Sequence, residues 1–332
     1  MRALILAPFD SACLDRLRTQ LDVAYESWTD TRKLQDPDAL GARLRADDIG
    51  VLIVEADFVF DEVFEAAPGL RLVGVCRNAL NQVDIDSATA HGVAVTHAPG
   101  RNTNAVAEMT LGLMLSLARR IPDANTLVHG GGWRDPAAAY GAFRGREIAA
   151  ATVGVVGFGQ IGREVARKCV ALGATVLAYD PIVPERQVTA LGATQASLED
   201  LASRADLVTF HVPERDETRR MVDAAFLARL KPGAFLVNTS AGGVVDSDAL
   251  TDALATGRLA GAALDVFDGH PLPLSSGLIG APNLILTPHI GGSTAETITR
   301  HSQIMAEEIE RLLDGEPLRH VVNPAYASAR VG

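Results

Sequence analysis

The chain has 332 residues, 48% of them hydrophobic, and a formal net charge of −11 at pH 7, so it is long enough for roughly two domains with separate cores. Acidic proteins are not attracted to nucleic acid or to an anionic membrane surface, and we expect neither as a partner. No apolar run approaches the roughly 18 residues of a membrane-spanning helix, no signal-peptide pattern opens the chain, and Cys13, Cys76 and Cys169 are scattered, which indicates a cytoplasmic protein with reduced thiols.

Short apolar runs alternate with helix-like segments over about the first hundred residues. The runs at 2–6, 49–54, 70–75 and 93–95 predict strands, and the segment 11–21 predicts a helix. Strands that alternate with helices indicate a small α/β domain with a sheet of its own. This domain has no Gly-rich turn between a strand and a helix, so it is not expected to bind a dinucleotide.

The loop after the strand at 70–75 is a candidate anion site. It begins Cys76-Arg77-Asn78-Ala79, and ligand sites in open α/β sheets lie at the carboxyl ends of strands. The planar guanidinium of Arg77 matches a carboxylate or a phosphate in a bidentate manner. We therefore predict that Arg77, Asn78 and Ala79 bind a substrate anion; the alternative is a structural ion pair of Arg77 with a neighbouring acid.

Residues 99–148 link this domain to the next. Pro99, Gly100 and Arg101 mark a boundary, and an apolar helix is predicted over 105–120 with Asn102 or Asn104 as its cap. The turn-rich segment 130–148 shows no clean period and is interpreted as an arm. The whole stretch 102–150 is predicted to be a hinge and dimerisation element.

The segment 152–180 has the pattern of a complete βαβ unit around Gly157, Gly159 and Gly162. The first glycine makes a tight turn, the second lets the backbone approach a pyrophosphate, and the third lets the helix pack close to the strand. The helix then begins at Gln160 and Ile161, where free N–H groups and the helix dipole favour an anion. Asp180, at the end of the second strand, can accept hydrogen bonds from a ribose 2′-hydroxyl and repels a 2′-phosphate. The pattern predicts NAD rather than NADP.

The α/β alternation continues to residue 294. Strands are predicted at 206–210, 234–237, 261–266 and 284–286, and helices at 198–203, 218–230 and 246–255. The loops 211–213, 238–243 and 287–294 follow strands of one parallel sheet, so they meet at one edge, where a nicotinamide should lie. The predicted fold class is α/β with two doubly wound parallel-sheet domains.

Eight segments together are similar to the D-isomer-specific 2-hydroxyacid dehydrogenase family, close to its phosphoglycerate dehydrogenase-like branch. They are NQVDID (81–86), PGRNTNAVAEMTLGLML (99–115), FRGREI (143–148), VGVVGFGQIGREVARK (153–168), HVP (211–213), LKPGAFLVNTSAGGVVDSDAL (230–250), GAALDVFDGHPLP (261–273) and LTPHIGGST (286–294). The resemblance implies a flavodoxin-like substrate domain from residues 1–101 and 288–332, an inserted Rossmann NAD domain over 102–287, an interdomain active site and a homodimer. It also implies an NAD-dependent enzyme that converts 2-oxo acids to D-2-hydroxy acids by hydride transfer.

The same resemblance assigns roles to individual residues. His289 matches the family's acid/base, for which an ordinary imidazole pKa near 6.5 is suited. Asp265 matches the residue near the nicotinamide carboxamide, and Thr239 and Ser240 match its ribose neighbours. The remaining cofactor contacts implied are His211, Val212, Pro213, Thr218, Ala241, Gly291 and Gly292.

Two positions depart from the family pattern. Ala241 stands where the family has an Arg that grips the substrate, and His270 stands where it has a Glu paired with the acid/base. Losing a charged donor aimed at the transition state costs about 3 to 4 kcal/mol. Losing the Glu removes the group that orients His289 and raises its pKa, and a neighbouring imidazole is not expected to replace it.

Three hypotheses follow for the function. The first is an active NAD-dependent oxidoreductase with a rearranged site, in which His289 works with His270 or Asp268 and an arginine binds the anion; Arg77 is favoured, and the alternatives are Arg101, Arg134 and Arg144. The second is altered redox chemistry on a phosphonate or an aldehyde. The third is a non-catalytic NAD-binding dimeric module. A zinc site at His270, His289 and Asp265 is disfavoured because no motif spacing supports it.

Overall fold

The computed structural model describes residues 1–329 and forms two compact units. Unit 1 comprises Met1–Arg101 and the chain from Ser293 onward, and unit 2 comprises Asn102–Gly292. The expected return to the first domain at residue 288 differs from this division, which keeps His289 in unit 2. The reason is local, because Asp265 of unit 2 accepts hydrogen bonds from the backbone of Ile290 and Gly291.

Unit 1 is built on a five-stranded parallel sheet of order β2-β1-β3-β4-β5. The strands are β1 (Arg2–Ile5), β2 (Asp22–Tyr25), β3 (Ile49–Val54), β4 (Leu72–Val75) and β5 (Ala94–His97). The helices are α1 (Ser11–Arg18), α2 (Trp28–Thr31), α3 (Pro37–Ala46), α4 (Asp61–Ala66), α5 (Ile85–Ala90), α14 (Ala295–Asp314) and α15 (Tyr326–Ala329).

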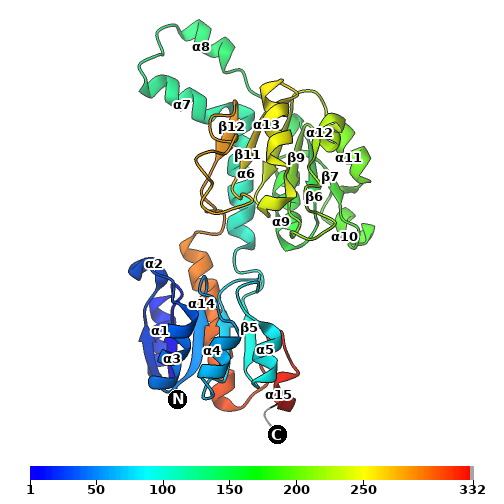
Figure 1. The fold of residues 1–332 in the computed structure, drawn as a ribbon. Helices are drawn as coiled ribbons and strands as arrows, with labels where there is room; N and C mark the ends of the chain where they lie inside the picture. Colours follow the sequence, from blue (N-terminus) through cyan, green and yellow to red (C-terminus); the bar gives the residue numbers. More distant parts are fainter. Residues whose placement is uncertain (330–332) are drawn as a thin grey trace. The chain divides into compact units, whose positions relative to one another are not determined.

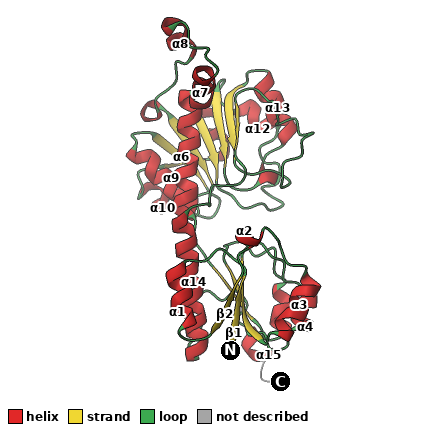
Figure 2. Ribbon diagram, turned by 90° about the vertical axis from the view of Figure 1, so that its left-hand side faces the viewer, coloured by secondary structure: helices red, strands yellow, loops and turns green. Residues whose placement is uncertain are grey.

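Alternation along the strands of unit 1 gives it two cores, one on each face of the sheet. In β1, Ala3 and Ile5 pack with α1 and α14, whereas Leu4 packs on the opposite face with α3 and α4. Figure 2 shows the sheet of this unit between these helix layers. The second chain segment is therefore part of unit 1 because α14 covers one face of its sheet.

Unit 2 is built on a seven-stranded parallel sheet of order β12-β11-β10-β9-β6-β7-β8. The strands are β6 (Thr152–Val156), β7 (Thr175–Tyr179), β8 (Thr194–Gln195), β9 (Leu207–Phe210), β10 (Ala234–Asn238), β11 (Leu259–Leu264) and β12 (Leu284–Leu286). The strand order reverses at β6, and ligands of such sheets bind outside the carboxyl ends of the strands at the reversal, which here are β6 and β9. The predicted class of two parallel-sheet α/β domains is confirmed.

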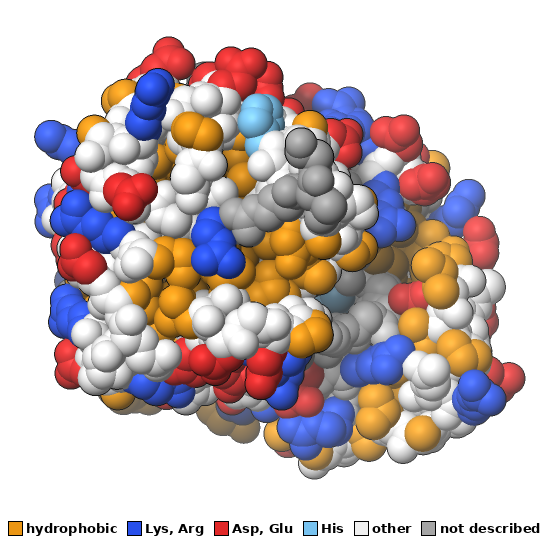
Figure 3. Space-filling view, turned by 90° about the horizontal axis from the view of Figure 1, so that it is seen from below, with side chains coloured by type: hydrophobic (Ala, Val, Ile, Leu, Met, Phe, Trp, Pro, Cys, Tyr) orange, Lys and Arg blue, Asp and Glu red, His pale blue; other side chains and the backbone are white. Residues whose placement is uncertain are grey.

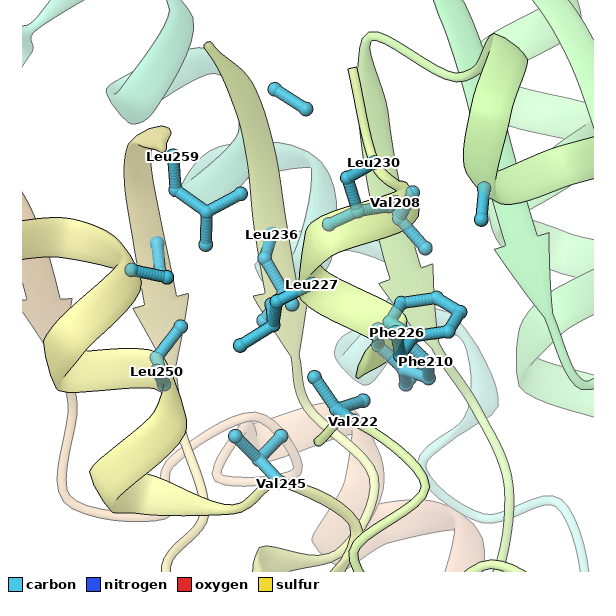
Figure 4. Close-up of a cluster of buried hydrophobic side chains, with 14 of the residues drawn as sticks. Val208, Phe210, Val222, Phe226, Leu227, Leu230, Leu236, Val245, Leu250 and Leu259 are labelled. Atoms are coloured by element: carbon cyan, nitrogen blue, oxygen red, sulfur yellow. The ribbon is translucent and has the colours of Figure 1, made fainter. Parts of the chain in front are cut away.

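Helices cover both faces of the unit 2 sheet (Figure 2). One face carries α6 (Thr103–Arg119), α9 (Gln160–Ala171) and α10 (Glu185–Thr189), and the other carries α11 (Leu198–Arg204), α12 (Ala224–Arg229) and α13 (Ser247–Ala255). Figure 4 shows the core under the second group, where Phe210 of β9 meets Phe226 of α12 with ring centroids 5.7 Å apart. Two short 3₁₀ turns, η1 (Ile148–Ala150) and η2 (Gly242–Val244), complete the unit.

The arm contains helices that the sequence did not predict. After α6, Arg120 adopts φ 53° and α7 (Ile121–His129) begins, followed by α8 (Pro136–Ala142) inside the segment expected to be irregular. Asp135 caps α8 by accepting hydrogen bonds from the N–H groups of Ala137 and Ala138, and Pro136 is favourable in a first turn. Figure 1 shows α7 and α8 standing away from the sheet of unit 2.

The helix predicted over 218–230 is wrong in its first half. Only α12 is helical there, and Arg220 has φ 50°. Val222 instead pairs with Val245 in an isolated parallel bridge, donating its N–H to Val244 and accepting from Asp246. This long-range pairing prevents the segment from becoming helical.

The surface mixes charges of both signs. On the face in Figure 3, acidic and basic side chains are interspersed around hydrophobic ones. Among residues 1–329, no helix is long and apolar enough to cross a membrane. Cys13, Cys76 and Cys169 are all buried and free.

Candidate active site

The Gly-rich loop after β6 has the geometry of an anion cradle. Gly157 has φ 90°, and a Cβ there would lie 2.5 Å from the carbonyl oxygen of His211; a Cβ at Gly162 would lie 2.0 Å from the oxygen of Gly157. At Gly159 a Cβ would meet nothing within 4 Å, so open space lies before the backbone. No side chain caps α9, whose first residues are Gln160 and Ile161. Two glycines are required by packing, and the third leaves room for a phosphate group at the helix N-terminus.

Asp180 lies at the end of β7, against this loop. Its Oδ2 accepts from the N–H of Phe158 at 2.7 Å, and its Oδ1 accepts from Ile182 and Val183. Burial alone would raise the pKa of the carboxyl, but these three N–H groups and the nearby Arg163 outweigh it and lower the pKa below its ordinary value. Asp180 is therefore ionised at neutral pH, and it also holds the Gly-rich loop in place.

The loop after β9 carries His211, Val212 and Pro213. The His211 ring is buried with its Nε2 3.1 Å from the hydroxyl of Thr209, and burial lowers its pKa to about 3, so the ring is neutral at pH 7. Its Nδ1 has no hydrogen-bond partner within the described part of the chain. Thr218 donates its hydroxyl to the carbonyl oxygen of Pro213 and closes the loop.

The loop after β10 is ordered by Asn238. The amide oxygen of this buried residue accepts from both the N–H and the hydroxyl of Ser240, and its Nδ2 donates to the carbonyl oxygen of Ala241. The hydroxyl of Thr239 lies 2.8 Å from that of Thr110 on α6. Sequence reasoning assigned no role to Asn238, which lies in the predicted loop 238–243, or to Thr110, whose contact with Thr239 joins residues 129 positions apart.

The loop that carries His289 is held by Asp265, at the end of β11. Asp265 is 1% exposed; its Oδ1 accepts from the Thr287 hydroxyl at 2.6 Å and from Ile290 N–H, and its Oδ2 accepts from Gly291 N–H. His289 has φ 55°, a left-handed conformation that these bonds maintain. Asp265 thus positions the backbone on both sides of His289, a role that the resemblance did not indicate.

His289 and His270 lie close together. His289 Nδ1 is 3.1 Å from His270 Nε2, and the ring centroids are 4.9 Å apart. Both residues are exposed. His270 therefore lies within hydrogen-bonding distance of His289 and can orient its ring, but an imidazole does not supply the negative charge of a Glu.

Ala241 lies next to the segment that carries His270. A Cβ at the adjacent Gly242 would lie 1.9 Å from the carbonyl oxygen of Phe267, so the two loops are in close contact. Ala241 and Phe267 both pack against the same core. The loop that carries Ala241 therefore packs against the segment that leads to His270 in unit 2.

The arginine alternatives on the arm lie elsewhere in unit 2. Arg134 and Arg144 flank α8, and the following Arg146 lies 4.0 Å from Asp206, which precedes β9. This end of the arm is at the amino edge of the sheet, opposite to the loops described above. Within one chain, neither arginine belongs to the edge that carries His289.

In unit 1, the loop after β4 carries Arg77, whose Nε is buried without a hydrogen-bond partner among residues 1–329. Burial lowers the pKa of this guanidinium, and Glu55 partly offsets the effect. Asn78 and Ala79 are exposed, and the carbonyl oxygen of Asn78 lies 3.3 Å from His97 Nδ1. Arg101 instead forms an ion pair with Glu55, with 2.7 Å between Nη1 and Oε1. No set of three or more His, Cys, Asp or Glu side chains in residues 1–329 could hold a metal ion.

A family model, described as "D-isomer specific 2-hydroxyacid dehydrogenase, NAD binding domain", matches residues 111–291, which include the Gly-rich loop and His289. The chain belongs to this family. Among its relatives is the D-3-phosphoglycerate dehydrogenase of Mycobacterium tuberculosis H37Rv, 39% identical over 318 residues, which cover 96% of this chain and 57% of that protein. The chain thus spans a little over half the length of the curated relatives that it matches.

Solved structures of the family resemble this chain over nearly its full length. The TT0316 protein from Thermus thermophilus has a TM-score of 0.84 at 33% identity and covers 97% of this chain and 100% of that chain. D-mandelate dehydrogenase from Rhodotorula graminis, in its apo form, has a TM-score of 0.83 at 28% identity and covers 97% of each chain. These matches agree with the observed sheets and with a nicotinamide dinucleotide as cofactor.

Proposed function

We propose that the protein is an NAD-dependent oxidoreductase that interconverts a small anionic 2-oxo acid and its 2-hydroxy acid. The observation that carries this proposal is the His289–His270 contact at 3.1 Å, on a loop clamped by Asp265 at the same sheet edge as the Gly-rich loop. An oriented imidazole beside a dinucleotide site is suited to move a proton during hydride transfer.

In this proposal His289 is the acid that protonates the carbonyl oxygen of the substrate. The contact between His289 Nδ1 and His270 Nε2, 3.1 Å apart, would orient the His289 ring for this transfer. A nicotinamide ring bound at this edge would supply the hydride. Asp265 keeps the His289 backbone fixed, and a neutral His270 fixes the ring without stabilising its charged form as strongly as a carboxylate would.

Arg77 is proposed to bind the substrate's carboxylate. Its buried Nε is unpartnered in the described structure, whereas Arg101 is neutralised by Glu55. A guanidinium with a spare donor is suited to a planar carboxylate. Asp180, ionised beside the Gly-rich loop, favours NADH over NADPH through repulsion of a 2′-phosphate.

Turnover tests this proposal most directly. NADH oxidation should be measured at 340 nm with a panel of 2-oxo acids, and in parallel with aldehydes and phosphonates. Turnover of 2-oxo acids supports the proposal, and turnover confined to the other compounds favours altered redox chemistry. NADH binding without any turnover would indicate a non-catalytic binding module.

A double variant tests the rearranged site. Ala241→Arg with His270→Glu restores both family positions and should raise activity on glyoxylate or hydroxypyruvate. Each single variant is the control for the pair. Lower activity in the double variant than in either single variant would show that the present site is not a weakened form of the family's site.

We also propose a cytoplasmic homodimer that uses the arm. Large apolar side chains are exposed on α7, namely Ile121 (52%) and Val128 (55%), and in the arm, namely Trp133 (59%) and Tyr140 (79%). Exposed apolar surface of this kind favours burial against a second copy. Light scattering at micromolar concentration should give twice the 35.0 kDa chain mass; a monomer would refute this role of the arm.

A further inference from the structure

Glu55, at the carboxyl end of β3, is held rigidly at the edge of the unit 1 sheet. Its Oε1 lies 2.7 Å from Arg101 Nη1, and both side chains are 11% exposed. Its Oε2 accepts from Trp28 Nε1 at 3.2 Å, and its carbonyl oxygen accepts from Gln82 Nε2 at 3.3 Å. Both carboxylate oxygens are therefore engaged, and the negative charge has a fixed place in this edge.

Among the described residues, Glu55 is the carboxylate that forms an ion pair with Arg101. Arg101 also donates to His301 Nδ1 at 2.9 Å; because a guanidinium only donates, Nδ1 is the acceptor, and His301 Nε2 carries the proton that it donates to the carbonyl oxygen of Pro8 at 2.7 Å. Burial lowers the pKa of His301, and Arg101 lowers it further, so the ring is neutral. Arg101 is thus committed to holding unit 1 together.

Arg77 is left with hydrogen-bonding capacity. Its buried Nε lacks a hydrogen-bond partner among the described residues. Burial lowers the pKa of this guanidinium, the charge of Glu55 raises it, and the charge of Arg101 lowers it. Arg300, a further guanidinium near this edge, donates its Nη1 to the carbonyl oxygen of Arg101 at 2.8 Å. One planar fork with a spare donor matches one carboxylate.

The segment that follows Glu55 offers no cation. It reads Glu-Ala-Asp-Phe-Val-Phe, residues 55–60. Phe58 and Phe60 are 44% and 37% exposed with ring centroids 5.4 Å apart, and Val59 between them pairs with Val83 in the segment after Arg77. Exposed aromatic rings without a cation suit an uncharged group better than a phosphate dianion.

From these contacts we infer that Glu55 determines specificity: it restricts the substrate to 2-oxo acids with a single carboxylate and an uncharged remainder. It neutralises Arg101, so this guanidinium adds no net positive charge that could hold a second anion beside Arg77. The inference rests on the proposed function for its reaction. It implies that this chain does not act on phosphorylated acids, although relatives carry the name D-3-phosphoglycerate dehydrogenase.

Hydroxypyruvate and its 3-phosphate provide a matched test, since they differ only in the phosphate. We expect kcat/KM, and also affinity for the NADH-loaded protein by calorimetry, to favour hydroxypyruvate by at least about tenfold. Equal or reversed preference, or no binding of either acid, overturns the inference. A tenfold binding preference without turnover supports the inference and refutes the proposed oxidoreductase activity.

Glu55→Gln removes the charge and keeps the side-chain shape. It should bring the preference for hydroxypyruvate over its phosphate down by about tenfold. Glu310→Gln is the matched control, because Glu310 also forms an ion pair within unit 1, 2.8 Å from Arg16 Nε, on the helix layer. An unchanged ratio in a folded Glu55→Gln protein contradicts the role of Glu55. If that variant does not fold, the wild-type preference between hydroxypyruvate and its 3-phosphate still tests whether the substrate is restricted to a single carboxylate.

Discussion

The Gly-rich loop and the loops that carry Ala241 and His270 belong to one sheet edge, but their geometry has different origins. The first is shaped by backbone contacts, as a Cβ at Gly157 or Gly162 would collide with main-chain oxygens. The loop of Ala241 depends on the side chain of Asn238, and the loop of His289, which His270 contacts, depends on the side chain of Asp265. Backbone contacts at the Gly-rich loop permit few residues other than glycine. Where side chains such as Asn238 and Asp265 hold the loops, other positions in these loops can change while the loops keep their shape.

The largest effect should come from the side-chain region. His289→Ala removes the proposed proton donor, so turnover should fall by about 10²- to 10⁴-fold. NADH affinity should stay nearly unchanged, because the ring acts on the substrate. Steady-state kinetics measure the loss of turnover, and a fluorescence titration measures the affinity for NADH. Turnover within threefold of wild type would assign the proton transfer to another group.

Arg77→Lys tests whether unit 1 contributes to the reaction. Lysine keeps the charge but loses the planar fork, so kcat/KM should fall by roughly ten- to a hundredfold, about 1.4 to 2.7 kcal/mol. Arg45→Lys, on α3, is the control. An unchanged kcat/KM for Arg77→Lys would make Arg77 a structural residue.

Two glycine variants separate binding from packing within one loop. A Cβ at Gly159 would meet nothing within 4 Å. Gly159→Ala should therefore keep its free energy of unfolding, while its affinity for NADH falls by about tenfold. Gly162→Ala meets a carbonyl oxygen at 2.0 Å and should unfold at lower urea, losing about 1 to 3 kcal/mol. Gly112→Ala, in open space on α6, is the control. Equal losses of stability in both loop variants would refute this division.

Asp180→Ala addresses cofactor choice. The wild type should bind NADH at least about tenfold tighter than NADPH, and the variant should narrow the gap because the repulsion of a 2′-phosphate is lost. Parallel titrations with NADH and NADPH measure the ratio of the two affinities in the wild type and in the variant. Equal wild-type affinities would remove Asp180 as the determinant. Since Asp180 also holds Phe158, thermal unfolding should be recorded alongside.

His211 predicts a pH dependence of stability. Its folded pKa of about 3 lies below the ordinary 6.5, so the unfolded chain takes up a proton first as the pH falls. The free energy of unfolding should therefore drop by about 1.4 kcal/mol per pH unit below 6.5. Urea unfolding at pH 6 and pH 5 should show a smaller difference in His211→Gln, while His129→Gln, exposed on α7, should behave like wild type.

The sequence was sufficient for features set by local chemistry. The buried strand β3 and the half-buried strand β12 match their predicted limits, since each is a continuous apolar run between polar residues. The Gly-rich loop was also predicted, because few other residues fit its turn. What the sequence did not reveal depends on distant pairs: Val222 with Val245 prevented a helix, and Glu55 with Arg101, 46 positions apart, neutralised a candidate clamp.

The contact of His270 with His289 is another pairing of residues that are distant in the sequence. The two residues are 19 positions apart, and their rings meet because Asp265 fixes the backbone around His289. The sequence indicated a lost carboxylate, but it did not show that the substituting ring would occupy hydrogen-bonding distance. A single sequence carries no direct signal for such an encounter.

The clamp formed by Asp265 makes this edge a convenient scaffold for enzyme engineering. Within the described residues its carboxylate accepts hydrogen bonds from the Thr287 hydroxyl and from the backbone of Ile290 and Gly291, and the side chains of residues 241 and 270 take no part. Libraries randomised at those two positions should therefore retain a folded His289 loop. Directed evolution could then explore new substrates from one fixed acid/base, without rebuilding the loop in each round.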